Sequence, residues 1–256
     1  MTTDRRVLVH HDVASLTGSV AARFITKVID LLDEQEVVHI SLTGGGVGTG
    51  VLRAIRSSDA RDEIDWSRVH VWWSDERWVG AGHHDRNDTA AREALLDHVG
   101  VLEQNVHPFA STDDGISLDE AATRYASTLA AHSRDGVGAP VFDIMLLGVG
   151  PDGHIASLFP DTPGVLVRDR SVIAVRDSPK PPPERVSLTL SAINASDRIW
   201  LGLAGADKAS ALGLLLAGAS TQQVPAAGVK GVKRTVFFVD AAAAAEVPEN
   251  LIASEY

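Results

Sequence analysis

Short apolar runs alternate with amphipathic helical segments along most of the chain. Runs rich in Val, Ile, Leu, Phe and Trp predict β-strands, at residues 6–10, 37–43, 68–75, 141–150, 185–190, 197–205 and 234–240. Apolar residues at helical spacing predict helices, at residues 14–34, 89–99, 118–129 and 207–216. The run at 141–150 is almost continuously apolar, which is typical of a central strand buried on both faces.

This alternation predicts an α/β fold, an open and mostly parallel twisted sheet with helices on both faces. No internal repeat is evident, and the proline-rich segment 178–185 is a short, stiff, extended loop between two strands. We therefore expect a single α/β domain over residues 1–256. The alanine-rich segment 241–247 is a candidate for a short terminal helix packed on that domain.

Composition narrows the classes of function. The 256 residues are 45% hydrophobic and 22% charged, as in ordinary globular proteins, and the formal net charge is −11. This acidity argues against a nucleic-acid or anionic-membrane partner.

Apolar runs stay well short of the roughly 18 residues that span a bilayer, and the N-terminus has no apolar signal-peptide region. The absence of cysteine excludes disulfides and thiolate chemistry, and we expect a cytoplasmic protein. The pattern does not distinguish a monomer from a dimer.

Parallel sheets bind ligands beyond the carboxyl ends of their strands. Four glycine-rich or polar loops stand there, at residues 43–50, 74–77, 148–154 and 205–208. In the first, Gly44, Gly45 and Gly46 follow a strand and open a helical pattern. Glycine lets the backbone approach a ligand, and N–H groups at a helix start favour phosphate. An ordinary glycine turn is the alternative.

Charged residues follow the strand at 68–75. Asp75, Glu76 and Arg77 lie between Trp73 and Trp78, which favours a partly buried pocket wall over a solvated charged turn. An arginine fork at such a wall can bind an anion through two hydrogen bonds.

A metal site at residues 83–88, HHDRND, is the weaker interpretation. Adjacent His83 and His84 do not easily face one ion, and no third ligand follows at helical spacing. A loop leading into a helix, with Asn87 or Asp88 as N-cap, is favoured. The ten histidines show no metal-binding spacing, so we expect no metal.

Residues 148–153, GVGPDG, match the dinucleotide fingerprint G-x-G-x-x-G letter for letter. However, Pro160 ends any helix starting at His154 within two turns, which is too short for the crossover helix that the fingerprint requires. We interpret the loop as one that delivers His154 to the mouth of a central strand. Histidine, with a pKa near 6.5, is the commonest general base. The alternative is a structural histidine capping a short helix.

Basic residues lie where an anion site needs them. Lys180 and Arg185 belong to the proline-rich loop, and Lys208 begins the helix after the strand at 197–205. Each alone could be a surface charge, but together they favour a phosphate site. With no cysteine and no G-x-S-x-G motif, the simplest chemistry is a histidine that activates water or moves a proton on the substrate.

These motifs together resemble the 6-phosphogluconolactonases. The resemblance runs from about residue 7 to 240 and includes SLTGGG, WWSDERWV, HDRNDTAAREALLDHV, FDIMLLGVGPDGHIASLFP, PKPPPERVSLTL and GADK. The related glucosamine-6-phosphate deaminases share the Gly-Asp-Gly-His segment but not SLFP or SDERWV. The resemblance implies the open α/β fold of those deaminases and of the ribose-5-phosphate isomerases.

The resemblance also implies hydrolysis of 6-phospho-D-glucono-1,5-lactone to 6-phosphogluconate in the oxidative pentose phosphate pathway, without a metal or organic cofactor. His154 resembles the base that activates water, and Asp75 and Arg77 resemble polar groups of the active site. The implied substrate and phosphate site comprises Gly44, Gly45, Gly46, Asn87, Gly150, Asp152, Gly153, Lys180, Arg185 and Lys208. Arg86 and Asp88 depart from the family pattern. A sugar-phosphate isomerase or deaminase on the same fold, and a non-catalytic sugar-phosphate-binding protein, are the alternatives.

Overall fold

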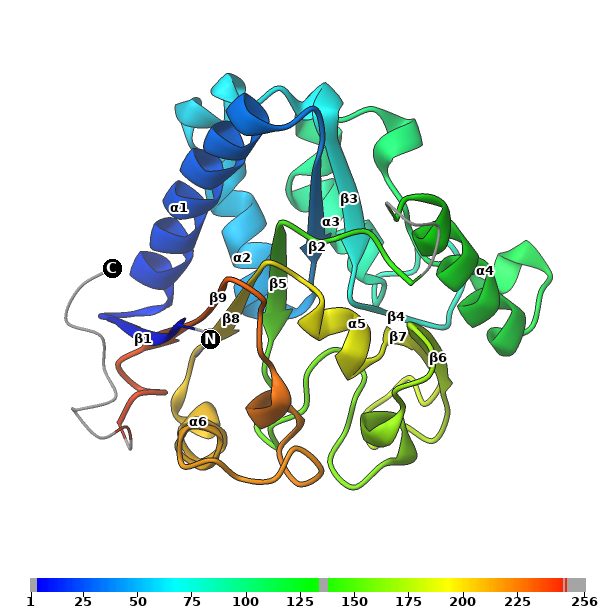
Figure 1. The fold of residues 1–256 in the computed structure, drawn as a ribbon. Coiled ribbons are helices and arrows are strands. Elements are labelled where there is room, and N and C mark those ends of the chain that lie inside the picture. The colour runs from blue at the N-terminus through cyan, green and yellow to red at the C-terminus, as the bar shows by residue number, and fades with distance from the viewer. Residues whose placement is uncertain (1–3, 134–137, 246, 248–256) are drawn as a thin grey trace.

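A six-stranded sheet in which every neighbouring pair is parallel forms the centre of the computed structural model, which describes residues 4–133, 138–245 and 247 (Figure 1). The strand order is β1-β9-β8-β5-β2-β3. Listed in that order, the bounds are Asp4–His10, Arg234–Asp240, Arg198–Leu203, Ile144–Gly148, Val38–Leu42 and Val69–Trp73. The sequence predicted all six strands, with ends that differ by up to three residues.

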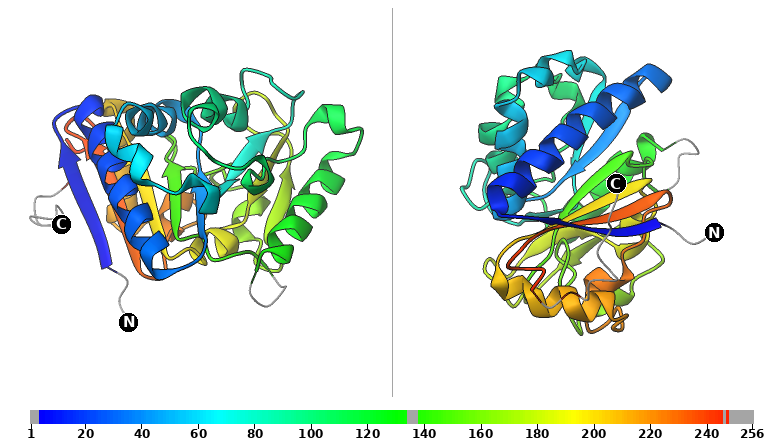
Figure 2. Two further views of the ribbon diagram at one scale, coloured as in Figure 1. Left: turned by 90° about the horizontal axis from the view of Figure 1, so that it is seen from above. Right: turned by 90° about the vertical axis from the view of Figure 1, so that its left-hand side faces the viewer.

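Helices cover both faces of this sheet. Figure 2 shows α1 and α2 on one side and α6 on the other. The helices are α1 (Val13–Glu34), α2 (Gly45–Arg56), α3 (Asn87–Ala94), α4 (Leu118–Ala131), α5 (Leu190–Asn194) and α6 (Ala209–Leu216). The predicted fold class is therefore confirmed, while the single domain over 1–256 stays a prediction. Among the described residues, no helix combines the length and the apolar character needed to cross a membrane.

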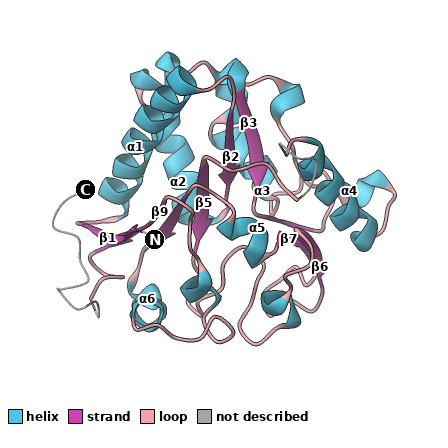
Figure 3. Cartoon of the chain, viewed as in Figure 1, coloured by secondary structure: helices cyan, strands magenta, loops and turns pink. Residues whose placement is uncertain are grey.

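A second, smaller sheet stands beside the main one (Figure 3). It is antiparallel, with the order β4-β7-β6, and its strands are Asp75–Arg77, Arg185–Leu188 and Val172–Val175. The sequence analysis joined residue 75 to the preceding strand and missed β6, because very short strands have little periodicity. The second sheet matters for the candidate site, because the pairing of β4 with β7 brings Arg77 opposite Arg185.

Two expected helices differ in the structure, and so does the short helix that one alternative placed after His154. Residues 154–160 form turns and isolated bridges instead of a short helix, because Ala156 adopts a positive φ of 47°. The helix expected over 89–99 gives way after Ala94 to a separate 3₁₀ turn. Residues 241–245 are hydrogen-bonded turns, because so short an alanine run gains too little to propagate as a helix. Residue 246 of that expected helix lies outside the described residues.

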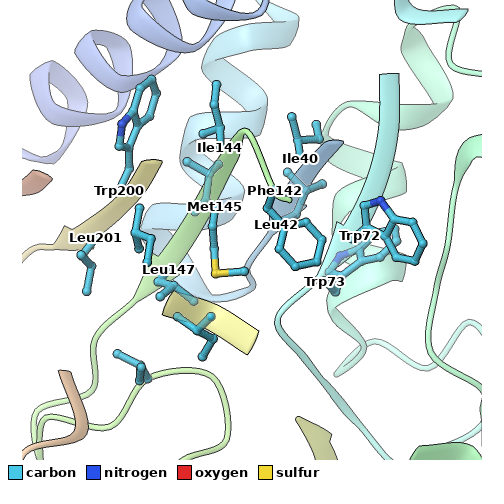
Figure 4. Packing of buried hydrophobic residues seen from close by; sticks show 14 of the residues in the cluster. Ile40, Leu42, Trp72, Trp73, Phe142, Ile144, Met145, Leu147, Trp200 and Leu201 are labelled. Carbon is cyan, nitrogen blue, oxygen red and sulfur yellow. The ribbon is translucent and has the colours of Figure 1, made fainter. Parts of the chain in front are cut away.

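Apolar side chains from the central strands fill both sides of the main sheet (Figure 4). Ile144, Met145, Leu146 and Leu147 of β5 are all buried, as expected for a strand covered on both faces. Trp72 and Trp73 of β3 are also fully buried. This packing holds the carboxyl ends of β2, β3, β5 and β8 in fixed positions along one edge of the sheet.

Candidate active site

A cavity of about 300 Å³ lies at the carboxyl edge of the main sheet. Residues that follow β2, β3, β5 and β8 contribute to its walls, as does the proline-rich loop before β7. Ten of the predicted site residues line it, namely Gly44, Gly45, Asp75, Arg77, Asn87, Gly150, His154, Lys180, Arg185 and Lys208. Gly46, Asp152 and Gly153 do not, although Asp152 contacts the histidine directly.

His154 lies between a carboxylate and an ammonium group. Its Nδ1 is 2.5 Å from Asp152 Oδ1 and 3.3 Å from Lys180 Nζ. Lys180 Nζ is also 3.6 Å from the same Asp152 oxygen. Burial raises the pKa of Asp152, but the hydrogen bond from His154 and the nearby positive charges outweigh burial and hold it well below its ordinary value. The ionised Asp152 therefore accepts the Nδ1 proton, which leaves Nε2 of the neutral imidazole as the basic nitrogen.

The glycines of this loop make room for the histidine. A Cβ atom on Gly150 would overlap His154 Nδ1 and Asp152 Oδ1. Gly150 N–H donates to the carbonyl of His154 at 2.9 Å, which closes the turn. Gly153 has a φ of +81°, and a Cβ there would come within 2.7 Å of a Val224 methyl group. Gly150 and Gly153 thus shape the loop around His154, while their predicted role in binding the substrate or phosphate stays a prediction.

The N-terminus of α2 faces the same cavity. Gly44 is its N-cap residue and offers no side-chain hydrogen bond, and its first turn carries no acidic residue. Gly45 adopts a φ of +79°. The first N–H groups of this twelve-residue helix are therefore uncapped by side chains, and the helix dipole favours an anion there.

Asp75 is 5% exposed and sits in a network of polar groups. Its Oδ2 accepts a hydrogen bond from Ser157 Oγ at 2.7 Å, and its carbonyl accepts one from Asn87 Nδ2 at 2.9 Å. A Cβ on Gly44 would overlap the Asn87 amide oxygen, so Asn87 also touches the α2 N-terminus. These contacts place Asp75 and Asn87 side by side on one wall.

Arg86 and Asp88 do not line the cavity, but they stabilise the segment that carries Asn87. Arg86 Nε donates to Asp88 at 2.8 Å and Arg86 Nη2 to the Phe109 carbonyl at 2.7 Å, and the Arg86 side chain is buried. The N-cap of α3 is Arg86, so the prediction of Asn87 or Asp88 as N-cap is wrong. The buried Glu76 carboxylate instead accepts the N–H groups of Asn87 and Asp88 from outside the helix. Burial raises the pKa of Glu76, and Arg86 opposes that rise.

Two arginines complete the positive side of the cavity. Arg77 Nη1 donates to the Asp85 carbonyl at 2.5 Å. Arg185 is almost fully buried, and its Nε and Nη2 donate to the carbonyls of Pro182, Lys180 and Pro181. Burial lowers the pKa of Arg185, and Asp75 opposes this. Arg185 therefore holds the proline-rich loop in place and also lines the cavity.

Lys208 approaches from the loop after β8. Its Nζ is 3.2 Å from Asp207, whose side chain is 62% exposed, whereas the Lys208 side chain is 19% exposed. The sequence analysis did not single out several lining residues, namely Thr43, Gly148, Val149, Pro151, Ala156 and Pro181. Thr43 and Gly148 are the first residues of two of the predicted loops, and that position was the available signal. The positive φ of Ala156 left no signal in the sequence.

His83, His84 and Asp85 lie outside the residues that line this cavity. The rings of His83 and His84 stack with their centroids 4.4 Å apart. One ligand atom from each of the three residues lies within 4.8 Å of the others. All three side chains are at least 40% exposed, and the loop leads into α3 as expected.

Comparison with known proteins places this arrangement in a family. The family model for glucosamine-6-phosphate isomerases/6-phosphogluconolactonase matches residues 11–238. A 6-phosphogluconolactonase of Streptomyces coelicolor is 46% identical over 255 residues, covering 98% of both chains. One from Mycobacterium leprae is 41% identical over 244 residues, covering 94% of this chain and 98% of its own.

Solved structures agree with this fold. The crystal structure of 6-phosphogluconolactonase from Thermotoga maritima matches with a TM-score of 0.81 at 26% identity, covering 93% of this chain and all of the other. A monomeric glucosamine-6-phosphate deaminase matches with a TM-score of 0.77 at 21% identity, covering 94% of this chain and 99% of its own, and shows the shared fold alone. The chain belongs to the glucosamine-6-phosphate isomerase/6-phosphogluconolactonase family.

Proposed function

We propose that this chain hydrolyses 6-phospho-D-glucono-1,5-lactone to 6-phosphogluconate, as a cytoplasmic enzyme of the oxidative pentose phosphate pathway. The observation that carries the proposal is the His154–Asp152 pair at a cavity that four cationic side chains also line, namely Arg77, Lys180, Arg185 and Lys208. Relatives that match nearly the whole chain bear the name 6-phosphogluconolactonase, which supports this substrate.

The proposed proton chemistry uses His154 twice. Nε2 takes a proton from water as the water oxygen bonds to the lactone carbonyl carbon, giving a tetrahedral intermediate. The intermediate then collapses, the bond from that carbon to the ring oxygen breaks, and the imidazolium returns its proton to the ring oxygen. Asp152 stabilises the imidazolium in between and keeps the Nδ1 proton in place. No metal is needed for these transfers, because a δ-lactone is a reactive ester.

The phosphate would be held away from the reacting carbon. The uncapped start of α2, together with the side chains of Lys208 and Arg185, supplies hydrogen-bond donors of the type that bind a phosphate dianion. Anchoring the substrate at a remote group holds the carbonyl near the base, and this lowers the entropic part of the barrier. The cavity volume of about 300 Å³ is of the order expected for a small ligand.

The oxyanion of the intermediate requires donors as well. Lys180 and Arg77 both line the cavity, and Lys180 Nζ lies within 3.3 Å of the histidine that activates the water. A cation in this cavity is suited to stabilise charge on the former carbonyl oxygen. Asp75 and Asn87, on the facing wall, offer acceptors and donors for the sugar hydroxyls.

The experiment that tests this proposal replaces His154, the proposed general base. His154→Gln should lower kcat for freshly prepared 6-phosphogluconolactone by roughly 10²–10⁴-fold, the range that general-base catalysis supplies, while leaving Tm near that of the wild type. His98→Gln, an exposed histidine outside the cavity, serves as the matched control. Near-normal turnover of His154→Gln would overturn the assignment. Release of ammonia from glucosamine 6-phosphate would favour the deaminase, and tight binding without turnover a sugar-phosphate-binding protein.

A further inference from the structure

A cluster of imidazoles lies at the amino edge of the main sheet, away from the cavity described above. His70 is the second residue of β3, His107 lies on the segment hydrogen-bonded beside β3, and His132 caps the C-terminus of α4. One ring nitrogen from each lies within 4.8 Å of the other two. The catalytic loops follow the opposite ends of β2 and β3, so these histidines take no part in the proposed hydrolysis.

We propose that His70, His107 and His132 form a binding site for a divalent transition-metal ion of the Zn²⁺ type. Imidazole nitrogen is a preferred ligand of Zn²⁺, Ni²⁺ and Cu²⁺, and three histidines with one open position make a common zinc coordination set. The ligands come from three separate segments, which is why no motif in the sequence marks them.

The distances between the ring nitrogens suit this ion. His70 Nδ1 and His107 Nε2 are 3.0 Å apart, with ring planes inclined by only 11°. These two nitrogens share a hydrogen bond. Two nitrogens bound tetrahedrally to zinc at 2.0–2.1 Å stand about 3.3 Å apart, so an ion taking the place of the shared proton requires only a small separation of the pair. His132 is partly exposed at a helix end, and a small movement of its ring completes the set.

A hydrogen bond to the backbone orients His132, the third proposed ligand. His132 Nδ1 is 2.9 Å from the Thr128 carbonyl, which can only accept, so Nδ1 carries the proton and Nε2 keeps its lone pair. A backbone carbonyl behind a ligating histidine is the usual way to fix its tautomer. His39 is excluded as a ligand through Nδ1, because that atom accepts the Trp72 indole N–H at 3.1 Å.

A cavity of about 530 Å³ lies at this edge of the sheet, and His132 lines it together with His39. His70 and His107 are not among its lining residues.

Bound metal would connect two parts of the fold. β3 is the edge strand of the main sheet, whereas α4 packs against β6 and β7 of the second sheet. A metal held by His70, His107 and His132 therefore fastens the main sheet to the smaller one, and the expected effect is stabilisation. Trp72 stacks on His107 with ring centroids 3.9 Å apart, so its fluorescence reports on the site.

The experiment titrates untagged, full-length protein with ZnCl₂ by isothermal calorimetry, with Tm and tryptophan fluorescence followed in parallel. The wild type should bind one equivalent of Zn²⁺ with a rise in Tm. His132→Gln and His70→Gln should each weaken binding by about 100-fold or more, because removing a ligand costs at least as much as removing its outer partner. His98→Gln, an exposed histidine elsewhere, should bind as the wild type does.

Two results would overturn the proposal. One is a wild type that binds no Zn²⁺, or whose affinity is unchanged in both ligand variants. The other is loss of binding in His84→Gln instead, which would place the ion at the exposed group of His83, His84 and Asp85. Far-UV circular dichroism and metal-free Tm of each variant distinguish loss of ligand from loss of fold, and using two ligand variants keeps the test valid if one is unstable.

Discussion

Asp152→Asn tests how His154 is held as a base. Asp152 Oδ1 is 2.5 Å from His154 Nδ1, whereas Lys180 Nζ is 3.3 Å from the same nitrogen. In the wild type the carboxylate accepts the Nδ1 proton. An amide at residue 152 can donate an N–H to Nδ1 instead, and Lys180 can donate there as well. Both favour the tautomer that carries its proton on Nε2, which cannot take one from water.

The magnitude follows from the strength of the lost contact. A hydrogen bond to a charged group contributes about 1.5–3 kcal/mol. The Asp152 side chain is 36% exposed, so solvent screening favours the lower part of that range, about 1.5–2 kcal/mol. At about 1.36 kcal/mol per tenfold change in rate, this predicts a fall in kcat of about 10- to 30-fold, and the tautomer shift adds to it.

The assay measures kcat and KM for 6-phosphogluconolactone separately, because Asp152 does not line the cavity and its loss should leave KM nearly unchanged. Asp161→Asn, an exposed aspartate on the same loop, is the matched control. An unchanged kcat in Asp152→Asn, or a rise in KM that accounts for the whole loss, would refute the positioning role of Asp152.

Three further substitutions test the positioning of His154, the binding of the phosphate and the hydrogen bond to Asp75. Gly150→Ala should lower kcat by roughly 10-fold or more, since its methyl group overlaps His154, and kinetics measure this. Lys208→Met should raise KM by about 10- to 100-fold with kcat nearly unchanged, because a charged hydrogen bond to phosphate contributes about 1.5–3 kcal/mol. Ser157→Ala should lower the free energy of unfolding by about 1.5–3 kcal/mol in urea, because it removes a donor to the buried Asp75.

Controls for these variants exist in the chain. Lys230→Met removes an exposed lysine away from the cavity and should leave KM unchanged. Ser127→Ala removes an exposed hydroxyl on α4 and should leave unfolding nearly unchanged. Equal effects in a variant and its control would contradict the corresponding assignment, as would wild-type kinetics in Gly150→Ala.

The sequence predicted the main sheet well, and ten of its candidate site residues line one cavity, for a physical reason. Long apolar strands such as β5 have strong patterns, and parallel strands place their following loops along one edge. Gly44, Asp75, His154 and Lys208 could therefore be assigned to one site before their contacts were known. The second sheet was missed because β4 and β6 have only three and four residues.

Contacts between distant segments were not predictable in this way. The sequence placed Lys180 on the proline-rich loop with Arg185, and only the folded chain brings it to His154. The same holds for the histidine cluster, since His70, His107 and His132 meet only where α4 ends beside β3. Pairwise proximity of this kind depends on tertiary packing, and hydrophobic periodicity contains no information about it.

The most direct test of the proposed function is a lactonase assay of the wild type with spontaneous hydrolysis subtracted. Freshly prepared 6-phosphogluconolactone and unphosphorylated gluconolactone are compared at equal concentrations. The account predicts rapid enzymatic hydrolysis of the phosphorylated lactone, with kcat/KM at least about 100-fold above that of the unphosphorylated one, because charged hydrogen bonds to the phosphate would be lost. Hydrolysis of both lactones at equal rates would contradict the phosphate site, and no rate above the spontaneous one would contradict the enzyme itself.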